Sequence, residues 1–149
     1  MMSNVYKIGI TKNNNKKIIE VSSIEVKADK GIVGDRHFSD FNDPYCQLSL
    51  IESENIDYYN TKYGLNIPHI DFRRNIVTKK IELNNLIGKK FLIGEVEVEG
   101  VDLCRPCKHL TQMLNQENIL KEFLRRGGIR CRILTTSKIS VGDKIKILK

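Results

Sequence analysis

The amino-acid sequence predicts a mainly β domain, a closed or partly open β-barrel with two or three short helices. Three observations support this prediction. Short runs of alternating apolar and polar residues recur along the chain, and glycine and asparagine turns separate them. Strands and helices do not alternate regularly enough along the chain for a parallel α/β sheet. The chain has 149 residues, which suffices for one core, so we expect a single domain over residues 1–149.

The chain begins with a predicted hairpin. Residues 5–10 and 17–26 have strand patterns, and the asparagines at 13–15 form a polar turn between them. A loop rich in turn-forming residues then runs over residues 31–44. Loops this long in a compact domain are often functional, so we expect this one to contribute to a site.

The middle of the chain predicts one helix followed by one strand. Ser49 and Glu52 have the spacing of a capping box, which predicts a helix start there. Gly64 is placed to end that helix. Residues 70–77 have a strand pattern with polar residues inside it, which suggests that one face of the strand lines a site.

The last third returns to a β pattern. Residues 91–101 alternate with a period of two and predict a long strand. Residues 110–126 have helical character, and residues 129–135 and 144–148 are expected to be the closing strands. Residues 141–143, Val-Gly-Asp, form the turn before the last strand.

The composition is that of a globular protein with a basic surface. The net charge is +7, and this charge has two interpretations: a solvated lysine-rich surface, or a surface for an anionic ligand such as a phosphate-bearing cofactor or a nucleic acid. No apolar run approaches about 20 residues and the N-terminus lacks the apolar stretch of a signal peptide, so we expect a cytoplasmic protein.

The motif Cys104-Arg-Pro-Cys107 follows the predicted long strand and is the strongest local signal. Structural zinc, simple burial of both thiols, and a reactive or metal-bound thiolate are all compatible with it. Arg105, Lys108 and His109 favour a thiolate over a thiol, and the thiolate is the form that attacks electrophiles and binds metals. We therefore favour a reactive or metal-binding thiolate.

Two further segments are candidates for a site. In a strand, Arg73 and Asn75 point to the same face, so together they could hold an anionic ligand. Residues 35–37, Asp-Arg-His, form either a ligand-binding loop or a surface turn. Cys46 and Cys131 are interpreted as core or wall residues.

An ordered series of short motifs resembles the MOSC family, the domains related to the C-terminal part of molybdenum-cofactor sulfurase. No single motif is specific, but their order is. The series consists of Gly34-Asp-Arg-His37, Gln47-Leu-Ser-Leu-Ile51, Arg73-Arg-Asn-Ile76, Leu86-Ile-Gly-Lys-Lys-Phe-Leu-Ile-Gly94, Cys104-Arg-Pro-Cys107 and Val141-Gly-Asp143. The resemblance covers most of the chain, and it implies a β-barrel like that of the pyruvate kinase barrel domain.

The resemblance also implies roles for individual residues. A metal-binding cysteine stands at the second position of a similar motif in amidoxime-reducing relatives, and this role carries over to Cys107 with molybdenum as the metal. Their Arg-Pro-Asn segment matches residues 73–75, so Arg73 and Asn75 inherit cofactor binding, while Arg74 replaces the proline and inherits nothing. Thr111 is a further cofactor contact implied by the resemblance. Pyridoxal phosphate belongs to a sulfurase domain outside this resemblance, and we expect none here.

The expected function is therefore binding of a molybdenum cofactor of the molybdopterin type, with Cys107 as metal ligand or persulfide-forming sulfur carrier. Arg36, Arg105 and Lys108 join Arg73 as a basic rim for the cofactor's phosphate, and Asp35 and His37 complete the wall.

An enzyme of this kind could reduce N-hydroxylated compounds or deliver sulfur to metal–sulfur centres. It would need an electron-donor or sulfur-donor protein as partner, or the enzymes of cofactor biosynthesis. The alternatives are a non-catalytic sulfur or cofactor carrier and a small basic barrel that binds RNA. The scarcity of aromatic residues argues against RNA, and we expect no membrane partner.

Overall fold

The computed structural model describes residues 3–12, 17–40, 43–106 and 108–148, with only the backbone of Lys108 and His109. The predicted turn at 13–15 and Cys107 lie outside this part. The strands are β1 (Asn4–Ile10), β2 (Ile19–Val21), β3 (Ser23–Lys27), β4 (Gly31–Ile32), β5 (Leu48–Glu52), β6 (Ile76–Lys79), β7 (Lys90–Ile93), β8 (Val96–Leu103), β9 (Ile129–Ile133), β10 (Ser137–Ser140) and β11 (Ile145–Ile147). The α-helices are α1 (Ser53–Tyr63), α2 (Lys108–Leu114) and α3 (Ile119–Glu122), and the 3₁₀ helices are η1 (His69–Phe72) and η2 (Leu83–Leu86).

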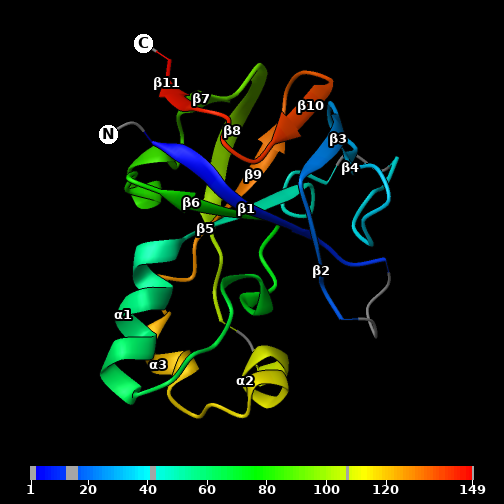
Figure 1. Cartoon of the computed structure of the whole chain (residues 1–149). Coiled ribbons are helices and arrows are strands. Elements are labelled where there is room, and N and C mark those ends of the chain that lie inside the picture. Colours follow the sequence, from blue (N-terminus) through cyan, green and yellow to red (C-terminus); the bar gives the residue numbers. More distant parts are fainter. Residues whose placement is uncertain (1–2, 13–16, 41–42, 107, 149) are drawn as a thin grey trace.

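The strands form a curled, partly open barrel (Figure 1). Eight of them make one sheet in the order β11-β7-β8-β9-β5-β6-β1-β2, and β10, β3 and β4 make a second sheet of three strands. The larger sheet curls until β1 meets the chain before β11: Val5 N donates to Asp143 O at 2.9 Å and Gly142 N donates to Val5 O at 2.8 Å. The mainly β, barrel-like prediction is confirmed.

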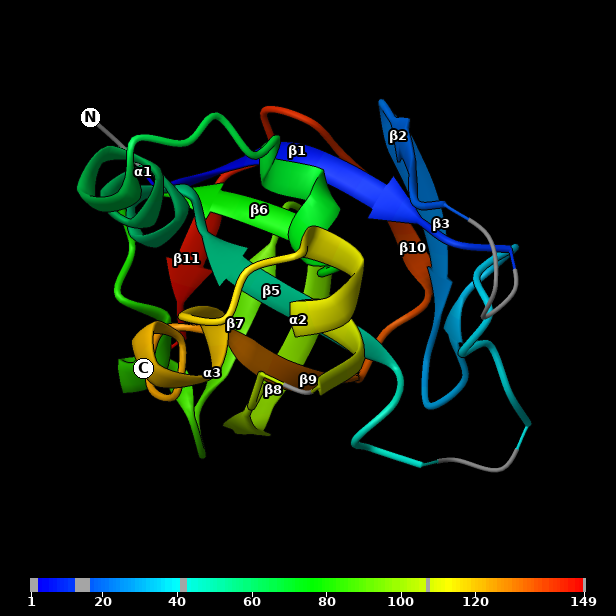
Figure 2. The same cartoon turned by 90° about the horizontal axis from the view of Figure 1, so that it is seen from below.

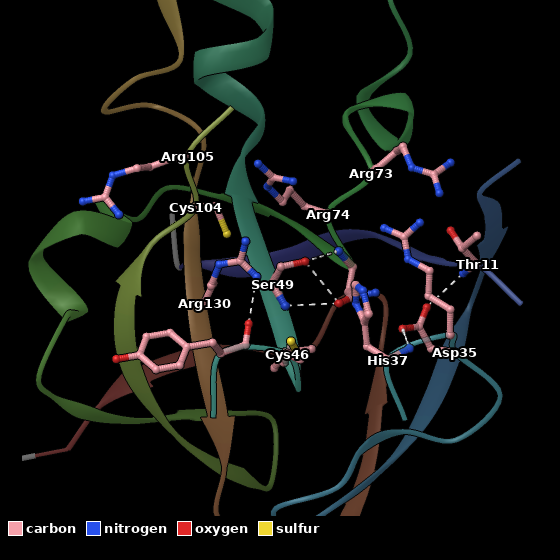
Figure 3. A pocket seen from close by; sticks show the side chains of 14 residues that line it. Thr11, Asp35, His37, Cys46, Ser49, Arg73, Arg74, Cys104, Arg105 and Arg130 are labelled. Carbon is pink, nitrogen blue, oxygen red and sulfur yellow. Dashed lines mark hydrogen bonds between the residues drawn. The ribbon is translucent and has the colours of Figure 1, made fainter. Parts of the chain in front are cut away.

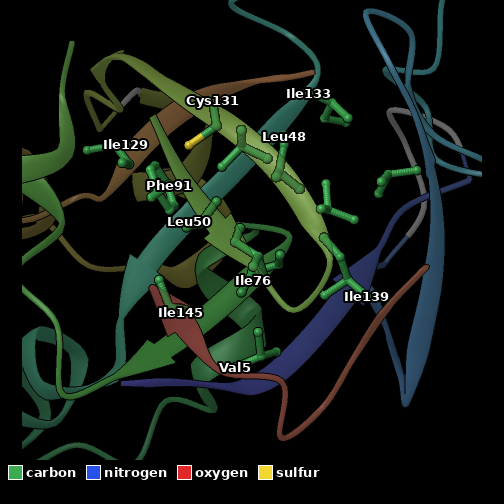
Figure 4. Packing of buried hydrophobic residues seen from close by; sticks show 14 of the residues in the cluster. Val5, Leu48, Leu50, Ile76, Phe91, Ile129, Cys131, Ile133, Ile139 and Ile145 are labelled. Atoms are coloured by element: carbon green, nitrogen blue, oxygen red, sulfur yellow. The ribbon is translucent and has the colours of Figure 1, made fainter. Parts of the chain in front are cut away.

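Aliphatic side chains fill the inside of the barrel (Figure 4). Leu50, Ile76 and Ile129, from three adjacent strands, are fully buried and lie in the same cluster as Phe91 and Ile145. In a small barrel the inward-facing side chains leave no channel. A ligand site must therefore lie at the rim or outside the barrel wall.

The three α-helices lie on the same side of the curled sheet (Figures 1 and 2). A second apolar cluster fills the space beneath them, with Ile56 and Tyr59 of α1 against Phe72 and Phe123. The rings of Phe72 and Phe123 have centroids 4.9 Å apart. None of the helices in the described ranges is long and apolar enough to cross a membrane.

Several local predictions are confirmed. β1 and β2 pair as an antiparallel hairpin with Ile8 opposite Val21, although the strand predicted over residues 17–26 is two strands, β2 in the larger sheet and β3 in the smaller one. Gly64 ends α1 in the left-handed conformation, at φ 64°, as a C-terminal glycine does. Gly142 has φ 93° in the predicted turn, a conformation that costs a residue with a Cβ atom more than it costs glycine.

The predicted helix start at Ser49 is wrong. Residues 48–52 form β5, which pairs with β9 on one side and in parallel with β6 on the other. A strand that is buried on both faces has a nearly continuous apolar sequence, so the period of its residues does not distinguish it from a helix. The helix begins at Ser53 instead, and its N-cap residue, Glu52, makes no side-chain capping hydrogen bond.

The single strand predicted over residues 91–101 is two strands. Ile93 lies opposite Val96, so Gly94 and Glu95 form a two-residue hairpin loop between β7 and β8. Gly94 has φ 60° at the first loop position, which fits a type II′ turn. The alternation of apolar and polar residues continues through such a short loop, so the sequence period does not reveal the loop.

The predicted helix over residues 110–126 is also divided. Asn115 has φ 53° and ends α2, and α3 follows as a separate short helix. Strand β10 was not predicted; it pairs with β3, and Ile139 lies opposite Ile24. Pairing between distant segments stabilises this short strand, whose own sequence is a weak signal.

Candidate functional site

A pocket of about 260 Å³ forms where the loop before β5, the segment between η1 and β6, the end of β8 and the start of β9 meet (Figure 3). Its lining consists of Thr11, Asp35, Arg36, His37, Tyr45, Cys46, Leu48, Ser49, Arg73, Arg74, Asn75, Cys104, Arg105 and Arg130. The predicted site residues of segments 35–37 and 73–75 and Arg105 all lie in this set. Folding thus brings together segments that are far apart in the sequence.

Ser49 on β5 lies in the middle of the pocket wall (Figure 3) and is hydrogen-bonded to Asn75, which precedes β6. Ser49 N and Oγ each donate to Asn75 Oδ1 at 3.1 Å, and Asn75 N donates to Ser49 Oγ at 3.0 Å. Asn75 Nδ2 donates to the carbonyl of Gly9 on β1 at 3.2 Å. The amide of Asn75 therefore ties β5 and β1 to the start of β6, and its first role is in the scaffold.

The arginines at 73 and 74 are positioned by a 3₁₀ turn, so the predicted strand over residues 70–77 is wrong in its first half. Arg73 follows η1 with φ 63° and ψ 29°, the left-handed conformation, and its N–H donates to Ile70 O. The chain enters β6 only at Ile76. This bend sends Arg73, Arg74 and Asn75 to the same pocket, where a strand would have sent Arg74 to the opposite face.

Asp35 braces the loop before β5. Its Oδ1 accepts the N–H of Thr11 at 2.9 Å and its Oδ2 accepts the N–H of His37 at 3.1 Å. The Arg36 N–H donates to Thr11 O at 2.7 Å, which joins the loop to the end of β1 a second time. Both carboxylate oxygens are thus engaged by the backbone, and the loop is held against the pocket.

His37 lies on the pocket wall as a neutral base. Burial is the main cause that lowers its pKa, and the charge of Arg36 lowers it further, while Asp35 acts in the opposite direction. A histidine with a pKa below its ordinary value is mostly uncharged at pH 7. His37 can therefore both donate and accept a hydrogen bond.

Arg130 was not predicted as a site residue, although it stands in the pocket wall. It points outward from β9, and its Nη1 donates to the carbonyl of Tyr45 at 2.8 Å. Tyr45 is held in turn by its N–H, which donates to Asp43 Oδ1 at 2.9 Å. The signal that could have found Arg130 is the register of β8 and β9, which places it opposite Asp102 beside the cysteine motif.

Two thiols line the pocket, those of Cys104 and Cys46. Cys104 is 1% exposed, and burial raises the pKa of its thiol, while the charges of Arg74 and Arg130 act to lower it. Burial likewise raises the pKa of Cys46, helped by a hydrogen bond to Asp43. Both groups are therefore thiols at pH 7.

The remaining predicted residues are placed less directly. Cys107, the predicted metal ligand, lies outside the described residues, as does the side chain of Lys108. Thr111 lies in α2, where its carbonyl accepts the N–H of Gln116 at 3.1 Å, and it is not among the described residues that line the pocket. Cys131 is fully buried in the barrel core, which fits its interpretation as a core residue.

The fold and the pocket define a class of protein: a small partly open β-barrel with an arginine-rich, thiol-bearing pocket outside the barrel wall. The chain belongs to the MOSC domain family, whose model matches residues 33–146. The matched range includes every lining residue of the pocket except Thr11.

Solved structures agree with this fold. The YuaD protein of Bacillus subtilis is 17% identical with a TM-score of 0.83, over 99% of this chain and 96% of its own. YiiM of Geobacillus stearothermophilus is 16% identical with a TM-score of 0.76, over 99% and 75%. YiiM of Escherichia coli is 18% identical with a TM-score of 0.71, over 99% and 68%. These identities support the fold alone, and a search of curated protein sequences finds no match.

The residues of the pocket fit a molybdenum–pterin cofactor, the group with which the family is associated. Such a cofactor carries a phosphate, which guanidinium groups bind well, and a soft metal–sulfur centre, which favours thiolate ligands. Within the described ranges, no group of three or more His, Cys, Asp or Glu residues is arranged to hold a metal ion. A metal bound here through cysteine would take its other ligands from the cofactor.

Proposed function

We propose that this MOSC protein binds a molybdenum cofactor of the molybdopterin type in the pocket, with Cys107 as metal ligand or sulfur carrier. The observation that supports this proposal is the lining itself. Five arginines and two thiols face one cavity, and the one carboxylate among the lining residues, Asp35, is engaged by two backbone N–H groups. Such a cavity favours an anionic ligand with a soft centre.

Arg36 and Arg73 would bind the phosphate of the cofactor, and neutral His37 would donate a hydrogen bond to it. Asn75 would act through the scaffold, because its amide fixes Ser49 and Gly9. Arg105, Lys108 and Thr111 follow or flank Cys104 in the sequence and remain proposed contacts on the thiol side. When bound, the molybdenum centre supplies oxygen-atom or sulfur-atom transfer chemistry.

The guanidinium groups of the pocket would favour the thiolate form of the working thiol. A cysteine in this pocket stands close to guanidinium groups, as Cys104 does to Arg74 and Arg130. Burial opposes ionisation of Cys104, so a bound metal centre would supply the further positive charge that favours a thiolate in this pocket. The protein could then reduce N-hydroxylated compounds with electrons from a partner protein, or carry sulfur received from a donor.

Metal and pterin analysis tests the proposal. Protein purified from a molybdenum-replete host should contain molybdenum and pterin in amounts close to one per chain, and Cys107→Ala should lose the metal or the cyanide-reactive sulfur. Arg125→Gln is a matched control, because it removes one exposed positive charge outside the pocket. It should leave both contents unchanged.

One outcome would overturn the proposal, and another would distinguish its two versions, the sulfur carrier and the cofactor enzyme. Wild-type protein without molybdenum or tungsten, together with unchanged sulfane sulfur in Cys107→Ala, would overturn it. Stoichiometric persulfide on Cys107 without metal would favour the sulfur carrier over the cofactor enzyme. Running Cys104→Ala beside Cys107→Ala shows which of the two thiols carries the function.

A further inference from the structure

The positive charge of the pocket exceeds what one phosphate requires. Its lining contains five arginines, and one carboxylate, Asp35, opposes them. A phosphate monoester carries about two negative charges at pH 7. The excess is a property of the folded chain, because the arginines come from four separate segments of the sequence.

The cations occupy two sides of the pocket (Figure 3). Arg73 lies toward one side with Asp35, His37 and Thr11, while Arg105 and Arg130 lie toward the other with Cys104. The electrostatic neighbours of Cys104 agree with this division, since they include Arg74 and Arg130. We name Arg74, Arg105 and Arg130 the thiol-side arginines.

Two of the thiol-side arginines are held by neutral partners. Arg74 Nε donates to the carbonyl of Gly127 at 2.9 Å, and Arg130 Nη1 donates to the carbonyl of Tyr45 at 2.8 Å. In the described part of the chain, neither guanidinium has a carboxylate within 4.0 Å. A carbonyl orients a guanidinium without cancelling its charge, so these two remain fixed and positive with donors to spare.

The third thiol-side arginine is more weakly engaged. Arg105 Nη1 lies 3.5 Å from Asp102 Oδ2, and their side chains are 65% and 43% exposed. Exposed ion pairs are weak and readily exchange partners. Arg105 can therefore turn toward a ligand in the pocket without a large cost.

We propose that the thiol-side arginines bind an anionic group of the substrate, such as a carboxylate or a small oxyanion, beside the reacting centre. This inference rests on the proposed function, which supplies the reacting centre and assigns the opposite side, with Arg36 and Arg73, to the phosphate of the cofactor. In the proposed function the metal or sulfur centre is on Cys107, three residues after Cys104 in the sequence, so we expect the cations beside Cys104 to lie near the substrate. The substrate class is thus anionic.

Sulfate titration tests this two-anion arrangement, because sulfate stays a tetrahedral dianion at all relevant pH values. Calorimetry on protein purified from a host that makes no molybdenum cofactor should show two sulfate sites per chain. Arg130→Gln should weaken one site about tenfold or more and leave the other, since a hydrogen bond to a charged group contributes roughly that factor. Arg73→Gln should weaken the opposite site, and Arg125→Gln should change neither. Arg130→Lys, which keeps the charge but loses the fork, should give an intermediate affinity.

A single sulfate site that Arg73→Gln and Arg130→Gln weaken equally would overturn the proposal, as would the absence of sulfate binding. Thermal unfolding of each variant shows whether it is folded. If Arg130→Gln is not folded, the sulfate affinity of Arg130→Lys tests the proposal instead. The molybdenum content of the same variants purified from a molybdenum-replete host reports the proposed function separately. In a preparation with full molybdenum the cofactor's phosphate occupies the opposite side, so one sulfate site that Arg130→Gln weakens is expected there, and the absence of that site refutes only the anionic substrate.

Discussion

Replacement of Asn75 by alanine should destabilise the protein although the residue lies in the pocket wall. Three side-chain hydrogen bonds are lost, from Ser49 N, from Ser49 Oγ and to Gly9 O. Each contributes about 1 kcal/mol net, so the free energy of unfolding should fall by about 3 kcal/mol. Asn75 is 8% exposed, so water cannot fully replace these bonds. For a chain of this length the melting temperature should fall by about 6–12 °C.

Urea unfolding followed by circular dichroism measures this change. Asn85→Ala is the matched control, because Asn85 is exposed and its Nδ2 donates to Glu82 Oε2 at 2.9 Å, a contact with another exposed side chain. It should change the free energy of unfolding by less than about 0.5 kcal/mol. Ser49→Ala combined with Asn75→Ala should cost less than the sum of the two, because they share bonds. Equal stability of Asn75→Ala and Asn85→Ala would refute the reasoning.

Two other predictions concern the backbone and the thiols. A Cβ atom at Gly128, where φ is 94°, would collide with the carbonyl oxygen of Leu50, so Gly128→Ala should lower the free energy of unfolding by about 3 kcal/mol. Gly34→Ala, with φ 89° and open space around it, should cost only about 1 kcal/mol, and equal urea midpoints for the two would contradict the steric argument. Burial raises the pKa of Cys104 and raises that of Cys131 well above its ordinary value. Native-state alkylation with iodoacetamide should therefore speed up at Cys104 as pH rises from 7 to 9 and remain absent at Cys131, and rapid labelling of Cys131 would show that the core opens.

The sequence contained much of the candidate site but not the reason that its parts meet. Segments 35–37 and 73–75 and the cysteine motif were each recognisable from their residue types and from the ordered MOSC motifs. Arg130 was missed, because its place depends on the register between β8 and β9. The strand predicted over residues 70–77, which would have turned Arg74 away from Arg73 and Asn75, is wrong in its first half for the same kind of reason. The left-handed conformation of Arg73 turns the chain toward the pocket. The position of this turn is fixed by η1, because Phe72 packs in the apolar cluster beneath α1.

Local chemistry alone determined the strand alternation, the hairpin of β1 and β2, and the glycine turns at Gly64 and Gly142. These features depend on neighbours within a few residues, so the sequence suffices to predict them. Only the tertiary structure decided that residues 48–52 are a strand, because β6 and β9 supply the hydrogen bonds that make it one. It also decided that one pocket collects five arginines, since charges that repel one another are held together only by the packing and hydrogen bonds of the whole fold.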